Sequence, residues 1–466
     1  MAQVSNTRRS PFLAGVYAPV DDELEVAELA VTGEIPGALR GTFVRNGPNP
    51  MFEPKGRYHI FDGDGMLHAV SLDEGRASYR NRWIRSAGLM AEIGARRALY
   101  GGMADADFPG PDVVGDAGPM KNVANTHVIR HAGRILALWE AGPPTEVNPE
   151  LATVGPFDFG GRLLGAMTAH PKIDPDSGEL LFFGYSALPP FLRYYVVDAA
   201  GELTRHVDLE LPAPVMMHDF VVTAEHVVFL DAPAVFDLEG FAAGGEMLSW
   251  RPELGARLGV MPRDGDARDV VWCEVDPCYV FHFLNAWTEG SHVHVDACRM
   301  EDMDIGLGDG PPPEGANGRL GRFTVDLGSG TASWEQLDDL PSDFPRIDDR
   351  RAGRRHRYGY VGAITGPSTG FGAFDAVVRH DLERGERAVC SFGAGHVVGE
   401  PVFAPDPGGT AEDDGWLVSF VYDAEHDTSD VVVLDARDVA GGPVARIHMP
   451  RRVPFGFHGS WFPAEP

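Results

Sequence analysis

The stretch Val453-Pro454-Phe455-Gly456-Phe457-His458-Gly459-Ser460-Trp461-Phe462 places one histidine among glycines and aromatic residues near the C-terminus. Chain ends are usually polar and poorly ordered. This one is apolar, so we expect it to be tied into the folded body. A buried imidazole must satisfy both of its nitrogens. His458 therefore needs partners elsewhere in the chain, either hydrogen-bonding groups of the core or a bound species.

Most of the chain consists of short runs with strand character that are separated by turns. Of the 466 residues, 57 are glycine and 37 are proline, which is typical of many strands joined by turns. About 25 such runs, for example Leu180–Tyr185 and Trp416–Tyr422, indicate an all-β propeller of six or seven four-stranded blades. No linker stands out, so we expect residues 1–466 to form a single domain. Ring closure must pair the last strand with an early blade, which explains an apolar C-terminus.

The composition limits the classes of partner that the protein can bind and indicates its compartment. A formal net charge of −30, from 39 basic and 69 acidic residues, repels nucleic acid and gives little attraction to anionic lipid. No apolar run approaches the length of a membrane span. The four cysteines contain no C-x-x-C pair, which fits a reducing compartment. We expect a cytoplasmic protein without nucleic-acid or protein partners, and transient contact with a membrane surface stays open.

Helical periodicity is scarce. The best candidate runs from Ser86 to Leu99, where apolar residues recur at roughly helical spacing. This helix either caps one face of the ring or forms an apolar lip through which a substrate enters. The segment from Ala232 to Met261 is irregular and apolar, which indicates a second insertion that covers a face of the ring.

Four of the 17 histidines share the setting of small or aromatic neighbours at strand edges: His170, His218, His282 and His458. In a propeller, strands that are far apart in sequence point at one axis. Four neutral imidazoles around that axis would form a nitrogen-rich metal site that suits iron, with two octahedral positions left for dioxygen and substrate. The alternative is that each is a hydrogen-bonded core histidine, and residue types alone do not decide between the two.

Motifs along the whole chain resemble those of one family. The segments Phe43-Val44-Arg45-Asn46-Gly47-Pro48-Asn49-Pro50 and His59-Ile60-Phe61-Asp62-Gly63-Asp64-Gly65-Met66, and those around the four histidines in order, are similar to motifs of the carotenoid cleavage oxygenases. The resemblance implies a seven-bladed β-propeller with a helical and loop cap over an axial iron ion, Fe(2+). It also implies that His170, His218, His282 and His458 are the ligands of that ion, with no organic cofactor.

The same resemblance implies that acidic residues support three of the histidines. Glu140 in Leu138-Trp139-Glu140-Ala141 and Glu400 in Gly399-Glu400-Pro401-Val402-Phe403 match two of these positions, and Asp343 stands where the family commonly has glutamate before Phe-Pro. A carboxylate that accepts the distal ring N–H fixes the tautomer and the direction of the imidazole. Asp343 is one methylene shorter, so its contact, direct or through water, is left open, as is the pairing of carboxylates with histidines.

The expected activity is cleavage of a carbon–carbon double bond by O2 in an apolar conjugated substrate, giving two carbonyl products. Stilbene cleavers of the family tend to carry lysine where this chain has Trp139, which favours a carotenoid or apocarotenoid. Trp139 and Phe281 are predicted to line the substrate tunnel. The alternatives are a stilbene- or phenylpropanoid-cleaving dioxygenase of the same family and, from another class, a metal-free propeller that only binds ligands.

Overall fold

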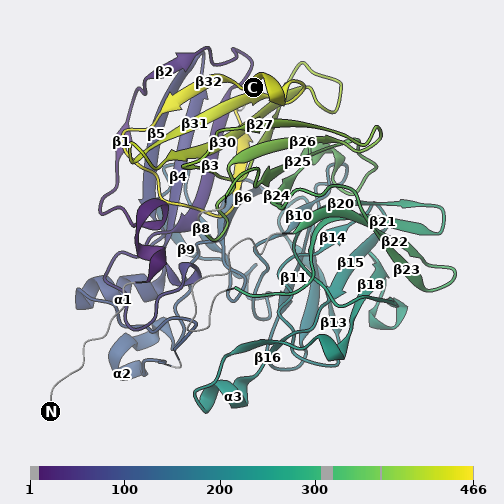
Figure 1. Cartoon of the computed structure of the whole chain (residues 1–466). Coiled ribbons are helices and arrows are strands. Elements are labelled where there is room, and N and C mark those ends of the chain that lie inside the picture. The colour runs from purple at the N-terminus through teal and green to yellow at the C-terminus, as the bar shows by residue number, and fades with distance from the viewer. Residues whose placement is uncertain (1–9, 106, 306–317, 368–369, 465–466) are drawn as a thin grey trace.

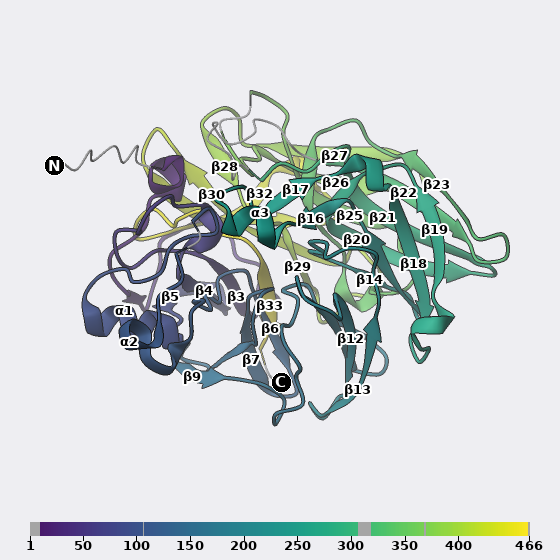
Figure 2. The ribbon, with the colours of Figure 1, turned by 90° about the horizontal axis from the view of Figure 1, so that it is seen from below.

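The structure is a computed structural model that describes residues 10–105, 107–305, 318–367 and 370–464. Within these residues, the strands form seven sheets of four to six strands and one additional two-stranded sheet. The seven larger sheets are the blades of a propeller (Figures 1 and 2). The all-β, seven-bladed fold that the sequence predicts is confirmed.

Five blades are built from strands in nearly consecutive order, antiparallel throughout. Their strands are β6 (His127–His131), β7 (Arg134–Leu138), β8 (Thr145–Val147) and β9 (Thr153–Pro156); β10 (Lys172–Ile173), β11 (Leu180–Tyr185), β12 (Leu192–Val197) and β13 (Leu203–Leu209); β14 (Val221–Val222), β15 (His226–Asp231), β18 (Ala256–Pro262) and β19 (Val271–Val275); β20 (Tyr279–Glu289), β21 (His292–Met300), β22 (Arg319–Asp326) and β23 (Thr331–Gln336); β24 (Ser342–Arg346), β25 (Tyr358–Ala363), β26 (Ala376–Asp381) and β27 (Glu386–Ser391).

The other two blades each combine strands from both ends of the chain. One contains β28 (His396–Val398), β29 (Val402–Pro405), β30 (Gly415–Asp423), β31 (Thr428–Asp435), β32 (Pro443–His448) and β2 (Val31–Gly33); the other contains β33 (Gly459–Pro463), β3 (Gly41–Pro48), β4 (Gly65–Asp73), β5 (Arg76–Trp83) and β1 (Glu25–Val26). The terminal strand β33 pairs with β3 over five positions, with Phe43 opposite Trp461. The expected closure of the ring by the C-terminal stretch is therefore confirmed.

The burial pattern of each strand follows its place in the blade. In β11 the first five residues are all buried, because neighbouring blades cover both faces of a central strand. In the outer strand β13, buried Leu203, Val207 and Leu209 alternate with more exposed residues, since such a strand has one solvated face. Aromatic side chains fill the spaces between blades: Phe182 and Tyr195 of one blade, with ring centroids 4.6 Å apart, pack with Leu136 and Leu138 of β7 in another blade.

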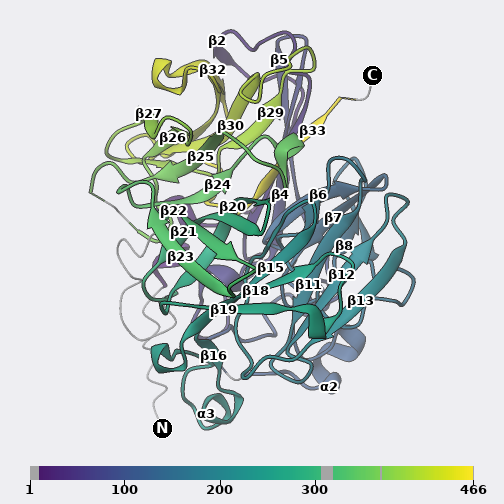
Figure 3. The same ribbon diagram turned by 90° about the vertical axis from the view of Figure 1, so that its right-hand side faces the viewer.

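One face of the ring carries the helical segments, and the described end of the chain emerges on the opposite face (Figures 1 and 3). The cap contains α1 (Ala87–Ala95), α2 (Pro111–Val114), α3 (Leu238–Ala242) and the hairpin of β16 (Ala234–Phe236) and β17 (Leu248–Trp250). Short 3-10 turns occur at Pro11–Leu13, Gly15–Tyr17, Ile60–Asp62, Gly115–Ala117, Pro252–Leu254, Ala267–Asp269, Asp349–Arg351 and Val439–Gly441. Among the described residues, no helix is long and apolar enough to cross a membrane.

Both predicted cap segments exist, but their bounds differ from the prediction. The helix expected up to Leu99 ends at Ala95, because Arg96 adopts a left-handed conformation with a φ of 55° that terminates the helix. The first alternative is confirmed, since α1 belongs to the cap. The apolar entry lip stays a prediction, because the α1 residue that lines the cavity described below is the carboxylate Glu92. In the second segment, residues 234–250 form the cap hairpin and α3, whereas Ala256–Pro262 is the blade strand β18. The extension of that insertion to Met261 was wrong.

Candidate metal centre

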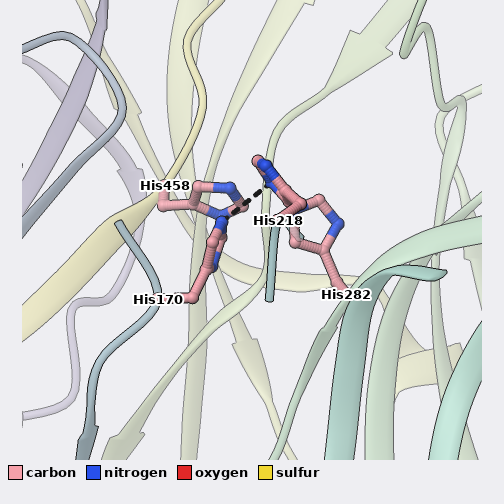
Figure 4. A group of neighbouring side chains, drawn as sticks. All are labelled: His170, His218, His282 and His458. Carbon is pink, nitrogen blue, oxygen red and sulfur yellow. Dashed lines mark hydrogen bonds between the residues drawn. The ribbon is translucent and has the colours of Figure 1, made fainter. Parts of the chain in front are cut away.

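The four histidines predicted from the sequence meet at the axis of the ring. His170 and His218 precede β10 and β14, His282 lies within β20, and His458 directly precedes β33. Each of these strands lies at one end of its sheet order, so the four side chains come from four blades and point toward one another (Figure 4). All four are buried, with at most 8% of the residue exposed.

The donor atoms are close enough to share one metal ion. One candidate nitrogen from each ring lies within 4.8 Å of all the others. Nε2 of His218 lies 2.9 Å from Nε2 of His170 and 3.3 Å from Nε2 of His282. Metal–imidazole bonds of about 2.1 Å place adjacent donors about 3 Å apart and opposed donors about 4 Å apart. The arrangement therefore fits a four-nitrogen metal site.

The three predicted carboxylates each contact one histidine on its outer nitrogen. Nδ1 of His218 lies 2.6 Å from Glu140. Nδ1 of His282 lies 2.8 Å from Asp343, and Nδ1 of His458 lies 3.0 Å from Glu400. An ionised carboxylate only accepts hydrogen bonds, so in each pair Nδ1 carries the proton and donates it. The lone pair on Nε2 is then free to face the axis.

Two irregular strands explain how the short Asp343 reaches its histidine directly. The pairing register of β20 shifts across His282, between Val280 and Phe283, and again between Phe283 and Asn285. The register of β24 shifts between Asp343 and Arg346, and Phe344 has a φ of 54°, which is rare for a bulky residue. Such bulges redirect side chains and are common beside active sites. No water is needed between Asp343 and His282.

The electrostatics of the cluster favour neutral imidazoles at two of its members. Burial, reinforced by the neighbouring histidines, holds the pKa values of His170 and His458 well below the ordinary value. Burial also acts to lower the pKa of His282, but the carboxylates of Asp343, Asp219 and Glu400 together outweigh it and the pKa is raised. A metal ligand must be deprotonated. The low values at His170 and His458 therefore favour cation binding.

A fifth buried histidine beside the cluster was not predicted from the sequence. The ring centroid of His127, in β6, lies 6.3 Å from that of His170 and 5.6 Å from that of His458. Its Nδ1 donates to the carbonyl of Ala169 over 2.9 Å. Burial, followed by the effect of His458, lowers the pKa of His127 to about 3. Like three of the other four histidines, His127 lies at the edge of a strand. It differs from them in position, because it is not part of the group whose nitrogens could share one metal ion.

A cavity of about 880 Å³ lies between the cap and the cluster and is lined by His218, His282 and His458. Next to the histidines its wall is aromatic: the ring of Phe344 lies 5.5 Å from His282 and 5.2 Å from His458. Phe281 lies 5.3 Å from the ring of His218. Both predicted tunnel residues, Trp139 and Phe281, line this cavity. Such a volume and lining are typical of a site for an apolar small molecule.

Sequence reasoning missed most of the other residues that line the cavity. Some belong to the cap and others to loops far apart in the chain, including Phe61, Tyr185, Met216, Phe236, Phe371 and Phe457. The only sequence signal was that aromatic residues adjoin the predicted ligands, as Phe457 adjoins His458. Lys121, which also lines the cavity, contacts both Asp64 and Glu92, at 2.7 and 2.8 Å. This buried polar group was also not predicted.

Comparison with known proteins gives consistent matches along nearly the whole chain. The profile of the family described as retinal pigment epithelial membrane protein matches residues 17–463. A carotenoid cleavage oxygenase of Mycobacterium tuberculosis is 37% identical over 98% of this chain and 98% of its own length. An isoeugenol monooxygenase of Pseudomonas nitroreducens is 35% identical over 98% of each chain. The crystal structure of Pseudomonas brassicacearum lignostilbene dioxygenase, 33% identical, has a TM-score of 0.91 and covers 98% of this chain and 99% of that chain.

A seven-bladed propeller with four buried histidines at its axis, next to a large aromatic cavity, defines a class of metal-dependent oxygenases. Within that class, the chain belongs to the carotenoid cleavage oxygenase family. The protein is therefore an enzyme of a family of dioxygenases that act on carbon–carbon double bonds. The family and the enzyme class predicted from the sequence are confirmed.

Proposed function

We propose that His170, His218, His282 and His458 hold Fe(2+) and that the protein cleaves a carbon–carbon double bond of a carotenoid or apocarotenoid with O2. The observation that carries this proposal is the aromatic cavity that ends on three of the four histidines. An extended apolar molecule in this cavity would place one of its bonds beside the metal site. Family membership supports the reaction class, and the wall supports an apolar substrate.

Side chains around the cluster orient the histidines and exclude water before any substrate enters. Glu140, Asp343 and Glu400 accept the outer ring protons of their histidines and so keep the Nε2 lone pairs directed at the axis. Phe344 and Phe281 cover the cavity side and exclude water from the reacting bond. When bound, Fe(2+) would supply the redox chemistry that the side chains lack for reaction with dioxygen.

The overall reaction balances without a further reductant. Breaking one C=C bond and adding both atoms of O2 gives two C=O groups, one at each of the former alkene carbons. No proton is released to the protein in this balance. The buried imidazoles and the absence of a required electron donor are therefore compatible with a reaction that takes place wholly inside the cavity.

The wall of the cavity favours a hydrocarbon substrate over a phenolic one. Trp139, which precedes Glu140, supplies an apolar surface. Lys121 also lines the cavity, but Asp64 and Glu92 already neutralise its charge, so it is not free to stabilise a phenolate. A stilbene or phenylpropanoid remains the second candidate, because Tyr100 lines the cavity and two relatives are named for lignostilbene and isoeugenol.

The cysteines, the exposed apolar side chains and the net charge indicate the compartment and the partners of the protein. We infer that it works in a reducing compartment, because its four cysteines are free and buried. Exposed apolar side chains, Phe108, Met120, Leu188 and Leu238, gather at the cavity and support transient contact of this face with a membrane, from which an apolar substrate would enter. The net charge of −30 argues against nucleic acid as a partner.

Metal analysis combined with product identification tests the proposal. Protein purified without chelator is expected to contain about one iron per chain. Incubation with β-apo-carotenals is expected to give two carbonyl products, each with one oxygen from ¹⁸O2, and resveratrol is expected to be cleaved more slowly. Iron-bearing protein that prefers resveratrol would establish the second candidate. A stable protein that does not bind metal would contradict the dioxygenase proposal and would support the metal-free propeller that only binds ligands.

Asp343→Asn is expected to weaken iron binding by about 10- to 100-fold. The amide can donate a hydrogen bond as well as accept one, so it no longer fixes the proton on Nδ1 of His282. Dissociation constants from competition with a chromophoric chelator measure the effect. Asp343→Glu is the matched control that keeps the charge. If the Asp343→Asn variant and the wild-type protein bind iron equally well, Asp343 does not orient His282.

A further inference from the structure

Asn46 is a fully buried polar residue beside the metal centre, in the motif-like segment 43–50. Its side-chain nitrogen Nδ2 donates hydrogen bonds to the carbonyl oxygens of Ala124 and His127, at 2.7 and 3.0 Å. Its Oδ1 accepts the backbone N–H of Gly47 at 2.9 Å. Because β3 and β6 belong to different blades, the two donated bonds fasten β3 to the segment of another blade that leads into β6.

The main chain of His458 lies between the two elements that Asn46 joins. The backbone N–H of Asn46 donates to the carbonyl of His458, and the carbonyl of Asn46 accepts the N–H of Phe457, both at 3.0 Å. The N–H of His458 donates to the carbonyl of Thr126 at 3.1 Å. The position of His458 is therefore set by the spacing between β3 and residues 124–127, and the side chain of Asn46 fixes that spacing.

His127 extends this connection to a second member of the cluster. Its carbonyl accepts from Asn46, and its ring donates from Nδ1 to the carbonyl of Ala169 at 2.9 Å. Ala169 directly precedes His170. His170 is the one cluster histidine that none of the three carboxylates contacts. The ring of His127 therefore restrains the main chain of His170, whereas a carboxylate restrains the ring of each other ligand.

A second cavity, of about 770 Å³, also reaches the cluster, and its lining includes His127, His170, His282 and His458. His170 lines this cavity and does not line the cavity between the cap and the cluster. Side chains in a packed core are fixed by their neighbours, whereas a ring beside a cavity lacks contacts on that side. Hydrogen bonds to the main chain must therefore supply part of the restraint on His170 and His458.

We propose that Asn46 and His127 are positioning residues that keep two ligand segments at the spacing that a shared metal ion requires. These segments carry His458 and His170, and the proposal rests on the metal site proposed above. The candidate nitrogens of the cluster lie within 4.8 Å of one another, and a metal–nitrogen distance tolerates deviations of only about 0.2 Å. A shift of one segment against the other would weaken metal binding even though every histidine is still present.

Iron binding by two variants of the full-length protein tests this proposal. Asn46→Ala removes both donated bonds and is expected to weaken Fe(2+) binding by about 10- to 100-fold, as is usual when a group that orients a ligand is lost. His127→Phe keeps an aromatic ring, removes the donor to Ala169 and is expected to weaken binding by about tenfold. Anaerobic competition with a chromophoric chelator gives the dissociation constants.

Asn49→Ala is the matched control, because Asn49 is equally buried and its side chain also makes two hydrogen bonds, to the main chain of Val20. Both alanine variants should lower the thermal midpoint of the metal-free protein, since each leaves buried main-chain groups without a partner. Asn49→Ala should keep the wild-type iron affinity. Bound Co(2+) gives a second readout, because its visible absorption depends on ligand geometry. The spectrum should change in Asn46→Ala and His127→Phe and stay unchanged in Asn49→Ala.

The outcomes separate this proposal from the proposed function. Wild-type affinity in both Asn46→Ala and His127→Phe would overturn the positioning role and leave the metal site intact. An equal loss of affinity in Asn49→Ala would also overturn it, because a general loss of stability would then explain the effect. A wild-type protein that binds no iron would overturn the proposed metal site and this proposal together. If Asn46→Ala does not fold, the affinity and spectrum of His127→Phe decide.

Discussion

His458→Ala is expected to abolish cleavage while the propeller remains folded. The substitution removes one of four donor nitrogens that lie within 4.8 Å of one another and leaves Glu400 without its histidine. A three-donor site should lose most of its bound metal, and turnover should fall by at least about a thousandfold, which corresponds to about 4 kcal/mol of lost transition-state stabilisation. Iron content, turnover and thermal unfolding are measured on the same preparation.

The fold should survive because β33, which follows His458, keeps its pairing with β3 and Glu400 keeps its hydrogen bond from the backbone of Gly459 at 2.8 Å. His380→Ala is the control, since His380 is also buried but does not belong to the cluster. It should retain iron and activity. Unchanged turnover in His458→Ala would show that His458 is structural and would contradict the proposed metal site.

Deletion of residues 459–466 is expected to destroy the cooperative fold. This truncation removes β33 (Gly459–Pro463), which pairs with β3 and also packs against the inner strands β6 and β29 of the two neighbouring blades. The buried Phe43 and Val44 of β3 would then face solvent at an open edge. The thermal midpoint should fall by about 10 °C or more, or the transition should vanish. Circular dichroism and calorimetry measure this.

Complementation distinguishes loss of closure from loss of metal. A peptide of residues 459–466 added to the truncated chain should restore part of the transition, because the missing strand can pair with the exposed edge of β3. The point variant Trp461→Ala, which keeps the backbone pairing, should lower the midpoint by much less. A truncated chain with wild-type stability would show that β33 is not needed to close the ring.

Local sequence patterns predicted the blades and the cap but not their limits. Turn residues such as Asp174-Pro175-Asp176-Ser177-Gly178 marked the hairpin between β10 and β11. The end of α1 at Ala95 depends on Arg96, whose left-handed conformation no residue type announces. The assignment of β18 to a blade depends on its pairing with β15 and β19, and pairing between segments far apart in the chain leaves little trace in local composition.

The sequence by itself determined the all-β class and the closure of the ring by the Val453–Phe462 stretch, because apolar patterns and turn residues are local properties. The four histidines were singled out by the resemblance of their motifs, in order along the chain, to one family. The tertiary structure decided what depends on distance. It pairs Glu140 with His218, Asp343 with His282 and Glu400 with His458, and it brings Asp343 into direct contact through the bulges of β20 and β24. It also places the lining residues of two cavities on different sides of one cluster, since the side of the axis that a residue faces is fixed only when the ring has closed.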